Sequence, residues 1–199
     1  MRTHDSAFTV VAAMAVALLL VGCGCNSRRA EAAASISHPS TTAPSRTSSF
    51  NDVDVMFVRQ MIPHHQQAIE MAQMASTRAQ NPKVKQLAAE ITVAQAAEIK
   101  TMTGWLHAWG KPVPTGMPAM MAPVPGMMSP QEMSQLMAAH GAQFDHTFLQ
   151  MMIRHHQGAV EMAKTEQARG LSPDAKKLAQ QIDTSQTAQI TQMRQMLEQ

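Results

Sequence analysis

Residues 54–72 read DVMFVRQMIPHHQQAIEMA, and residues 145–163 read DHTFLQMMIRHHQGAVEMA. The two stretches agree at eleven of 19 positions with a fixed offset of 91 residues. The same offset continues without a gap into the pairs Pro82/Pro173, Leu87/Leu178 and Leu106/Leu197. This agreement indicates that one unit occurs twice in the chain.

Each copy of the unit predicts two helices. The first helix runs from about 52 to 79, and in the second copy from about 143 to 169. The second helix begins after Asn81-Pro82 and after Ser172-Pro173, because Asn or Ser as the N-cap followed by Pro is a typical helix start. Two helical hairpins joined by short turns predict an all-α four-helix bundle.

Polar side chains fall on the inward stripe of each first helix. At about 100° per residue, Asp54, Met61 and His65 lie nearly in line, and His64 falls on the same stripe. The second copy repeats this arrangement with Asp145, Met152, His155 and His156. On the second helices, the otherwise apolar stripe carries Gln95, Glu98, Gln186 and Gln189.

These buried polar groups need partners, since an unpaired one costs about 1–3 kcal/mol. Imidazole, thioether and carboxylate groups in register favour a metal site, with the eight residues of the two first helices as candidate ligands. The alternative is a buried Asp–His hydrogen-bond network that fixes the packing of the helices.

The segment between the two copies, residues 111–141, is rich in methionine and proline. It holds seven Met and six Pro, and a packed core cannot be built from so many prolines. Thioethers select Cu(I) over hard cations, so this segment favours copper. The alternative is an apolar loop that covers the end of the bundle. Ser129 and Glu132 form a capping-box pattern that predicts a short helix carrying Met133 and Met137.

Other function classes lack their signatures. With 16 basic and 14 acidic residues, the chain has a net charge of +2 and no basic stripe, which argues against nucleic-acid binding. A di-iron oxidoreductase needs two Glu-x-x-His motifs, and a zinc protease needs His-Glu-x-x-His. The sequence contains neither motif, so we expect a binding protein rather than an enzyme.

The N-terminus predicts export. After the basic Arg2, an apolar run from Ala7 to Val21 has the length of a signal peptide, and it ends in Leu20-Val21-Gly22-Cys23, which resembles a bacterial lipobox. We therefore predict a signal peptide over 1–22, with Cys23 lipidated and the protein held on the outer side of the cytoplasmic membrane. The alternatives are a plain secretory signal or a short anchor. The role of Cys25 stays open.

A disordered tether is expected over 23–50, because this segment is rich in Ser, Thr, Ala and Pro. The bundle then covers 51–199. Its parts are repeat one (51–110), the Met/Pro-rich linker (111–141) and repeat two (142–199).

The two blocks with a double His-His motif resemble the bacterial domain of unknown function 305 family. The motif runs Phe-x3-Met-Ile-x-His-His-x2-Ala-x2-Met-Ala in both copies, starting at Phe57 and at Phe148, and the first copy ends in Trp105-Leu106-x2-Trp109-Gly110. The resemblance covers about residues 50–199. It implies a ferritin-like four-helix bundle in an exported protein.

Some members of that family bind copper in the periplasm as part of copper resistance. By this resemblance the same eight residues are the positions to carry over as ligands. The resemblance implies that the chain buffers copper or hands it, as Cu(I), to a partner that the sequence does not identify. A structural or interaction module of the cell envelope, without metal, is the alternative function.

Overall fold

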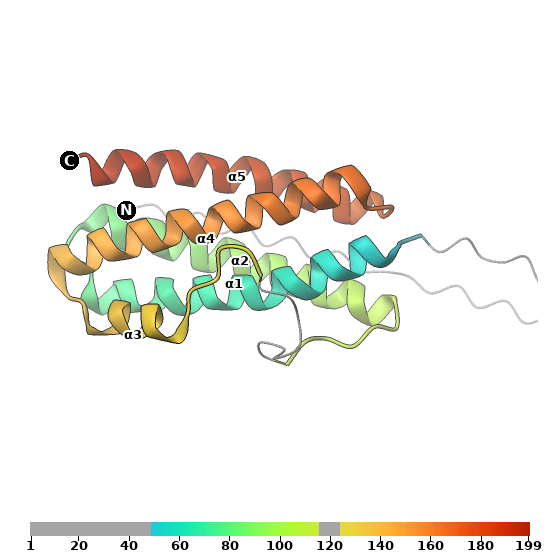
Figure 1. Cartoon of the computed structure of the whole chain (residues 1–199), viewed down its shortest axis with the longest axis horizontal. Coiled ribbons are helices and arrows are strands. Elements are labelled where there is room, and N and C mark those ends of the chain that lie inside the picture. Colours follow the sequence, from blue (N-terminus) through green and yellow to red (C-terminus); the bar gives the residue numbers. More distant parts are fainter. Residues whose placement is uncertain (1–48, 116–123) are drawn as a thin grey trace, which may run out of the picture. The chain divides into compact units, whose positions relative to one another are not determined.

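The computed structural model describes residues 49–115 and 124–199. It contains five helices: α1 (Asp52–Arg78), α2 (Pro82–Ala108), α3 (Pro130–Ala138), α4 (Gly141–Arg169) and α5 (Pro173–Leu197) (Figure 1). No strand occurs in the described part of the chain, and the all-α prediction is confirmed. The signal peptide, nearly all of the tether with Cys23, and three linker methionines (Met117, Met120 and Met121) lie outside the described residues.

The helix starts follow the capping residues in the sequence. Asn81 and Ser172 cap α2 and α5 through their side chains, with proline at the first helical turn, as predicted. Ser129 caps α3 in a capping box with Glu132, which confirms the short linker helix. The start of α4 is the exception, because it lies at Gly141, two residues before the predicted position, and His140 caps it without a side-chain hydrogen bond.

The two hairpins meet along their first helices. α1 packs against α2, and α4 packs against α5, while α1 and α4 pack against each other at the interface between the hairpins. The short helix α3 contacts both α1 and α4 (Figure 1). The sides of α1 and α4 that face each other therefore meet in the middle of the bundle.

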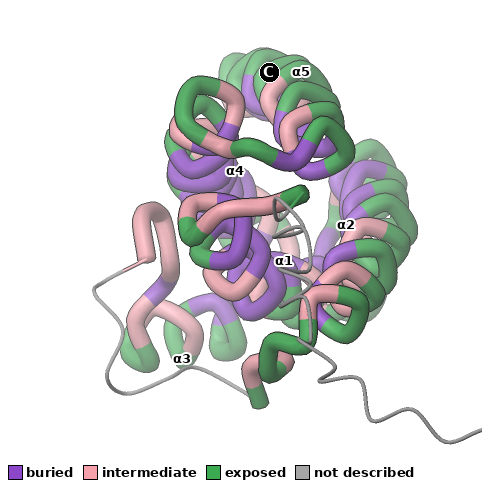
Figure 2. The backbone as a smooth tube through the Cα atoms, turned by 90° about the vertical axis from the view of Figure 1, so that its right-hand side faces the viewer, coloured by how far each residue is buried: buried purple, intermediate pink, exposed green. Residues whose placement is uncertain are grey.

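Burial follows the predicted stripes. In the view along the helices, buried segments of the four long helices face the interior and exposed segments face outward (Figure 2). Every residue predicted on the inward stripe of α1 is buried: Asp54, Phe57, Met61, His64, His65, Ala68, Ala72 and Ala75. Among the helices that the structure describes, none is long and apolar enough to cross a bilayer.

Candidate metal centre

Four histidine side chains meet where α1 packs against α4. His64 and His65 from α1, and His155 and His156 from α4, are all completely buried. The rings of His64 and His155 lie with their centroids 3.7 Å apart at an angle of 37°. Within each consecutive pair the centroids are 6.4 Å apart. The predicted inward orientation of both His-His motifs is therefore confirmed.

Side chains of α2 and α5 form hydrogen bonds with two of the imidazoles. His65 Nε2 lies 2.7 Å from the carboxylate of Glu98, and His156 Nε2 lies 2.8 Å from the amide oxygen of Gln189. Because both outer groups accept hydrogen bonds, each Nε2 carries the proton and donates it, which leaves the Nδ1 lone pair free. Of the four polar residues predicted on the stripes of α2 and α5, Glu98 and Gln189 thus orient histidines, whereas the side-chain oxygens of Gln95 and Gln186 have no hydrogen-bond partner among the described residues.

The third outer partner is a backbone carbonyl. His64 Nε2 lies 3.1 Å from the carbonyl oxygen of Pro125 and donates to it. Inside the cluster, the Nδ1 atoms of all four rings, and Nε2 of His155, have no hydrogen-bond partner among the described residues. Metal-binding histidines have this arrangement, in which the outer nitrogen is fixed by an acceptor and the inner nitrogen is available to an ion.

Burial favours the neutral form of three of the rings, those of His64, His155 and His156. The pKa values of His64 and His155 lie well below the usual range, first because burial disfavours the charged ring and then because neighbouring imidazoles repel a second charge. Burial also lowers the pKa of His156 to about 4. Neutral rings keep the lone pairs that a metal ion needs.

A short linker segment, Val124–Met128, lies directly over the histidines, and we call it the strap. The side chain of Gln67 donates to the Met128 carbonyl and accepts from the Met128 N–H, at 2.9 and 2.7 Å. Gly158 of α4 lets the strap backbone approach, because a Cβ there would lie 2.0 Å from the carbonyl oxygen of Pro125. Gly126 has φ +78° and would also collide with α4 if it carried a Cβ.

The strap accounts for two differences between the matched sequence blocks. Gly158 stands where the first block has Gln67, and Arg154 stands where it has Pro63. Arg154 lies 2.8 Å from the sulfur of Met128 and pairs with Glu132 of α3. Sequence reasoning missed the strap, although a glycine inside an otherwise matched helical block was a signal for close backbone contact.

Replacing Gly158 with alanine should lower the free energy of unfolding by about 1–3 kcal/mol, because the strap has to move away from the added methyl group. Gly104→Ala is the matched control. It is also helical, but nothing lies within 4 Å of its Cβ position, so alanine there should raise stability by about 0.5–1 kcal/mol. Urea unfolding followed by circular dichroism measures both. Equal effects at the two positions would contradict the close seating of the strap.

The two aspartates do not join the histidines. Asp54 accepts hydrogen bonds from the backbone N–H groups of Leu171 and Ser172, at the turn between α4 and α5. Asp145 does the same for Gln80 and Asn81, at the turn between α1 and α2. Ten residues of helix, about 15 Å, separate Asp54 from His64. Each aspartate thus fastens the turn of the opposite hairpin, which corrects the expectation that all eight residues converge on one place.

The two methionines of the predicted set, Met61 and Met152, are fully buried one helical turn before the histidines. They belong to two different apolar clusters, which lie on either side of the imidazoles along α1 and α4. In the linker, Met128 is buried in the core and Met133 packs against it, whereas Met137 is half-exposed. Part of the linker methionine content therefore packs in or against the core, a place that neither the copper prediction nor its alternative, an apolar loop over the end of the bundle, had given it.

Within the ranges 49–115 and 124–199, no group of three or more histidine, cysteine, aspartate or glutamate side chains is arranged around one ion position. The imidazoles instead approach in pairs, and the shortest ring approach joins the two hairpins.

One buried acidic residue, Glu166, was not predicted from the sequence. Glu166 of α4 is completely buried, and burial together with the neighbouring Asp54 carboxylate raises its pKa to about 8. It stands 91 residues after Ala75, which belongs to the predicted inward stripe. The offset alone would therefore have placed this carboxyl group inside the bundle.

Comparison with known proteins finds a matching family model and similar solved structures. The family model described as "Domain of unknown function (DUF305)" matches residues 54–197. A DUF305 protein from Streptomyces coelicolor has a similar crystal structure, with 36% identity and a TM-score of 0.69 over 73% of this chain and 92% of that one. CopM in its Cu(I)-bound form shows 38% identity and a TM-score of 0.63 over 73% of this chain and 95% of that one.

CopM has also been solved with Cu(II) and with silver bound. Among curated proteins, the uncharacterized protein L153 of Acanthamoeba polyphaga mimivirus is 41% identical over 61 residues. That match spans 31% of this chain and 40% of the viral protein, so it concerns a part of each.

Proposed function

Because the chain belongs to the DUF305 family and is similar to a protein solved with copper and silver bound, we propose that it is an exported protein that binds monovalent copper. The observation that carries this proposal is the set of four buried imidazoles. Their inner nitrogens lack partners, while three of the outer nitrogens are fixed by acceptors.

A purely structural role explains this set less well. A packing network would be expected to pair the inner nitrogens with each other, since each unpaired buried group costs about 1–3 kcal/mol. A bound ion would use these nitrogens and offset the cost. The second candidate function is therefore an envelope module without metal. Its support is that Asp54 and Asp145 accept hydrogen bonds from the backbone of the two turns.

The cellular setting completes the proposal. We propose that Cys23 carries a lipid anchor and that the bundle lies on the outer side of the cytoplasmic membrane, where it buffers Cu(I) or passes it to a partner. The lipobox-like segment supports this location. The complete burial of the four imidazoles supports buffering over catalysis in this proposal.

Cu(I) titration of the full chain against a competing chelator tests the function. We expect sub-micromolar binding by the natural protein, and at least tenfold weaker binding by the double variant His64→Gln/His155→Gln, because the closest pair of ring nitrogens is removed. His146→Gln is the matched control on the exposed face of α4 and should bind as the natural protein does. Circular dichroism verifies that each variant is folded.

Two results would contradict the proposal. The first is binding by the natural protein no tighter than the micromolar range. The second is an unchanged affinity in a folded double variant, which would place the ion elsewhere.

A further inference from the structure

A pocket of about 210 Å³ lies between the N-terminal half of α1 and the C-terminal half of α4. Its wall includes the thioethers of Met56 and Met162 and the carboxyl groups of Glu161 and Glu166. Met56 is 46% exposed, whereas Met162 is 7% exposed, so one sulfur side chain stands toward solvent and the other lies deep in the wall. Neither methionine belongs to the set predicted from the sequence.

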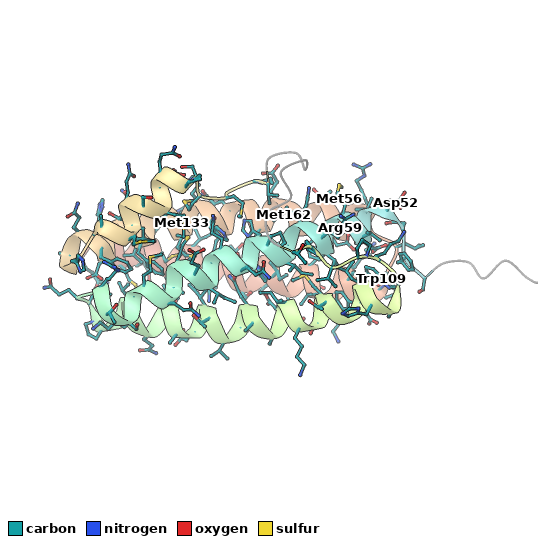
Figure 3. The ribbon with its side chains drawn as sticks, turned by 90° about the horizontal axis from the view of Figure 1, so that it is seen from below. Asp52, Met56, Arg59, Trp109, Met133 and Met162 are labelled. Carbon is teal, nitrogen blue, oxygen red and sulfur yellow. The ribbon has the colours of Figure 1, made fainter. Side chains whose placement is uncertain are left out.

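The other half of the bundle has a corresponding groove, and it is filled. The positions 91 residues away include Phe144, Phe148 and Met71, and the linker helix α3 covers them with Leu136 and Met133. Figure 3 views the groove from below, with Met133 on the covered half and Met162 and Met56 along the open half. Within residues 49–115 and 124–199, the chain therefore covers one of these two regions with α3 and leaves the pocket at the other uncovered.

The open groove also differs in chemistry from the covered one. Gln60, Thr165 and Glu166 stand where the covered groove has Met151, Met74 and Ala75. Exposure to solvent would explain why the pocket is more polar than the covered region. Two features of the pocket do not fit this explanation. A half-exposed Met56 replaces a threonine, and Glu166 is completely buried with no hydrogen-bond partner for either oxygen among the described residues.

The pocket adjoins the imidazoles through one residue of the strap. Pro125 lines the pocket, and its carbonyl oxygen is the acceptor for His64 Nε2 at 3.1 Å. An ion in the pocket is thus separated from the histidines by the strap backbone rather than by a layer of packed side chains.

Two thioethers in one pocket select a soft monovalent cation, because hard cations prefer oxygen ligands and gain little from sulfur. The exposed carboxylate of Glu161 at the same pocket adds attraction for positive charge. We propose that this pocket is an entry site, at which Met56 and Met162 capture Cu(I) before it reaches the buried imidazoles. The transfer part of this inference rests on the proposed function, since the histidines are the destination.

Methyl-labelled methionine reports on the pocket directly. The full chain with ¹³C in every methionine methyl group is titrated with Ag(I), a soft and diamagnetic substitute for Cu(I), and Met56→Leu and Met162→Leu assign the signals. We expect the Met56 and Met162 signals to shift, both in the natural protein and in His64→Gln/His155→Gln. The signal of Met137, half-exposed on α3, should stay unchanged.

Loading kinetics supply the second measurement. Met56→Leu/Met162→Leu keeps the apolar volume and removes both sulfurs, so we expect Ag(I) to reach the histidines at least tenfold more slowly, with an equilibrium affinity within twofold of the natural protein. Met137→Leu is the matched control and should load at the natural rate.

The outcomes separate the two proposals. If the histidine ring signals shift while the Met56 and Met162 signals do not, the entry site is wrong and copper binding stands. If the two methionine signals shift while the histidine signals never do, the pocket binds the ion but the proposed destination is wrong. An equilibrium affinity that falls as far as the loading rate would make the methionines final ligands and overturn their role at an entry site.

Discussion

Asp54→Ala should lower the free energy of unfolding by roughly 3–5 kcal/mol, the largest effect we expect from any single substitution outside the apolar core. The Asp54 carboxylate is completely buried. It accepts the N–H groups of Asn51, Leu171 and Ser172 at 2.6–3.1 Å. Alanine leaves these donors without a partner, so α1 loses one half of its capping box and the α4–α5 turn loses its hydrogen bonds to α1.

Two other aspartates serve as graded controls in urea unfolding followed by circular dichroism. Asp145→Ala removes two hydrogen bonds at a partly exposed turn and should cost about 2 kcal/mol. Asp52→Ala lies on the exposed first turn of α1 and should cost less than about 1 kcal/mol. If Asp54→Ala were no more harmful than Asp52→Ala, the carboxylate would not be the fastening that its geometry indicates.

The same variant also separates structure from metal binding. Because Asp54 lies about three helical turns from His64, folded Asp54→Ala protein should keep the Cu(I) affinity of the natural protein. A fall in affinity as large as that of the histidine variants would return Asp54 to the ligand set.

Local signals were enough to predict most of the fold. The helix starts at Pro82 and Pro173 depend on the residue before each proline, and the buried faces depend on a period of 3.6 residues. Both are properties of a few neighbouring residues, which a sequence displays directly. The same periodicity placed His64, His65, His155 and His156 inside the bundle.

Periodicity could not predict which groups meet, because it gives the direction of a side chain and not its partner. Asp54 points inward as predicted, but its partner is the backbone of Leu171, 117 residues away. The acceptor for His64 is a carbonyl oxygen of the strap. Every residue has a backbone carbonyl, so the sequence does not indicate which one accepts this hydrogen bond. The predicted ligand set therefore contained four histidines that the structure brings together and two aspartates that bind the backbone of the two turns instead.

The linker methionines also show that local sequence patterns do not predict contacts between distant segments. A proline-rich segment was expected to stay outside the core, but the strap turns back over α4 and brings Met128 into it. The turn depends on Gly126 with φ +78° and on the space that Gly158 leaves. Two glycines 32 positions apart become one contact only when the helices are assembled.

Relative to Glu166→Gln, the natural protein should lose stability as the pH rises from about 5 to 9. The pKa of Glu166 is raised from 4.5 to about 8, first by burial and then by the Asp54 carboxylate. In most of this range the folded chain holds a proton on Glu166 that the unfolded chain has released. Raising the pH therefore favours unfolding through this group, and the free energy of unfolding of the natural protein should fall by roughly 2–4 kcal/mol relative to that of the variant.

Asp54 acts in a different pH window and with the opposite sign. Hydrogen bonds from Asn51, Ser172 and Leu171, together with Glu166, outweigh the effect of burial and hold the pKa of Asp54 below its ordinary value of 3.8. Its contribution to stability is present above that pH and is lost as the pH falls below it. The buried histidines, whose pKa values are lowered, add stability as the pH rises from 5 to about 7, and they do so equally in the natural protein and in Glu166→Gln. The difference between these two proteins from pH 5 to pH 9 therefore isolates Glu166.

Thermal unfolding at a series of pH values tests the effect of Glu166. In Glu166→Gln, the neutral amide keeps the shape of the protonated acid, so from pH 5 to pH 9 the melting temperature of the natural protein should fall by several degrees relative to that of the variant. Glu70→Gln is the control, since Glu70 is exposed on α1 and should leave the slope of the natural protein unchanged. Parallel slopes for the natural protein and Glu166→Gln would show that Glu166 is ionised in the folded chain, and the shared burial of the two acids would then need another explanation.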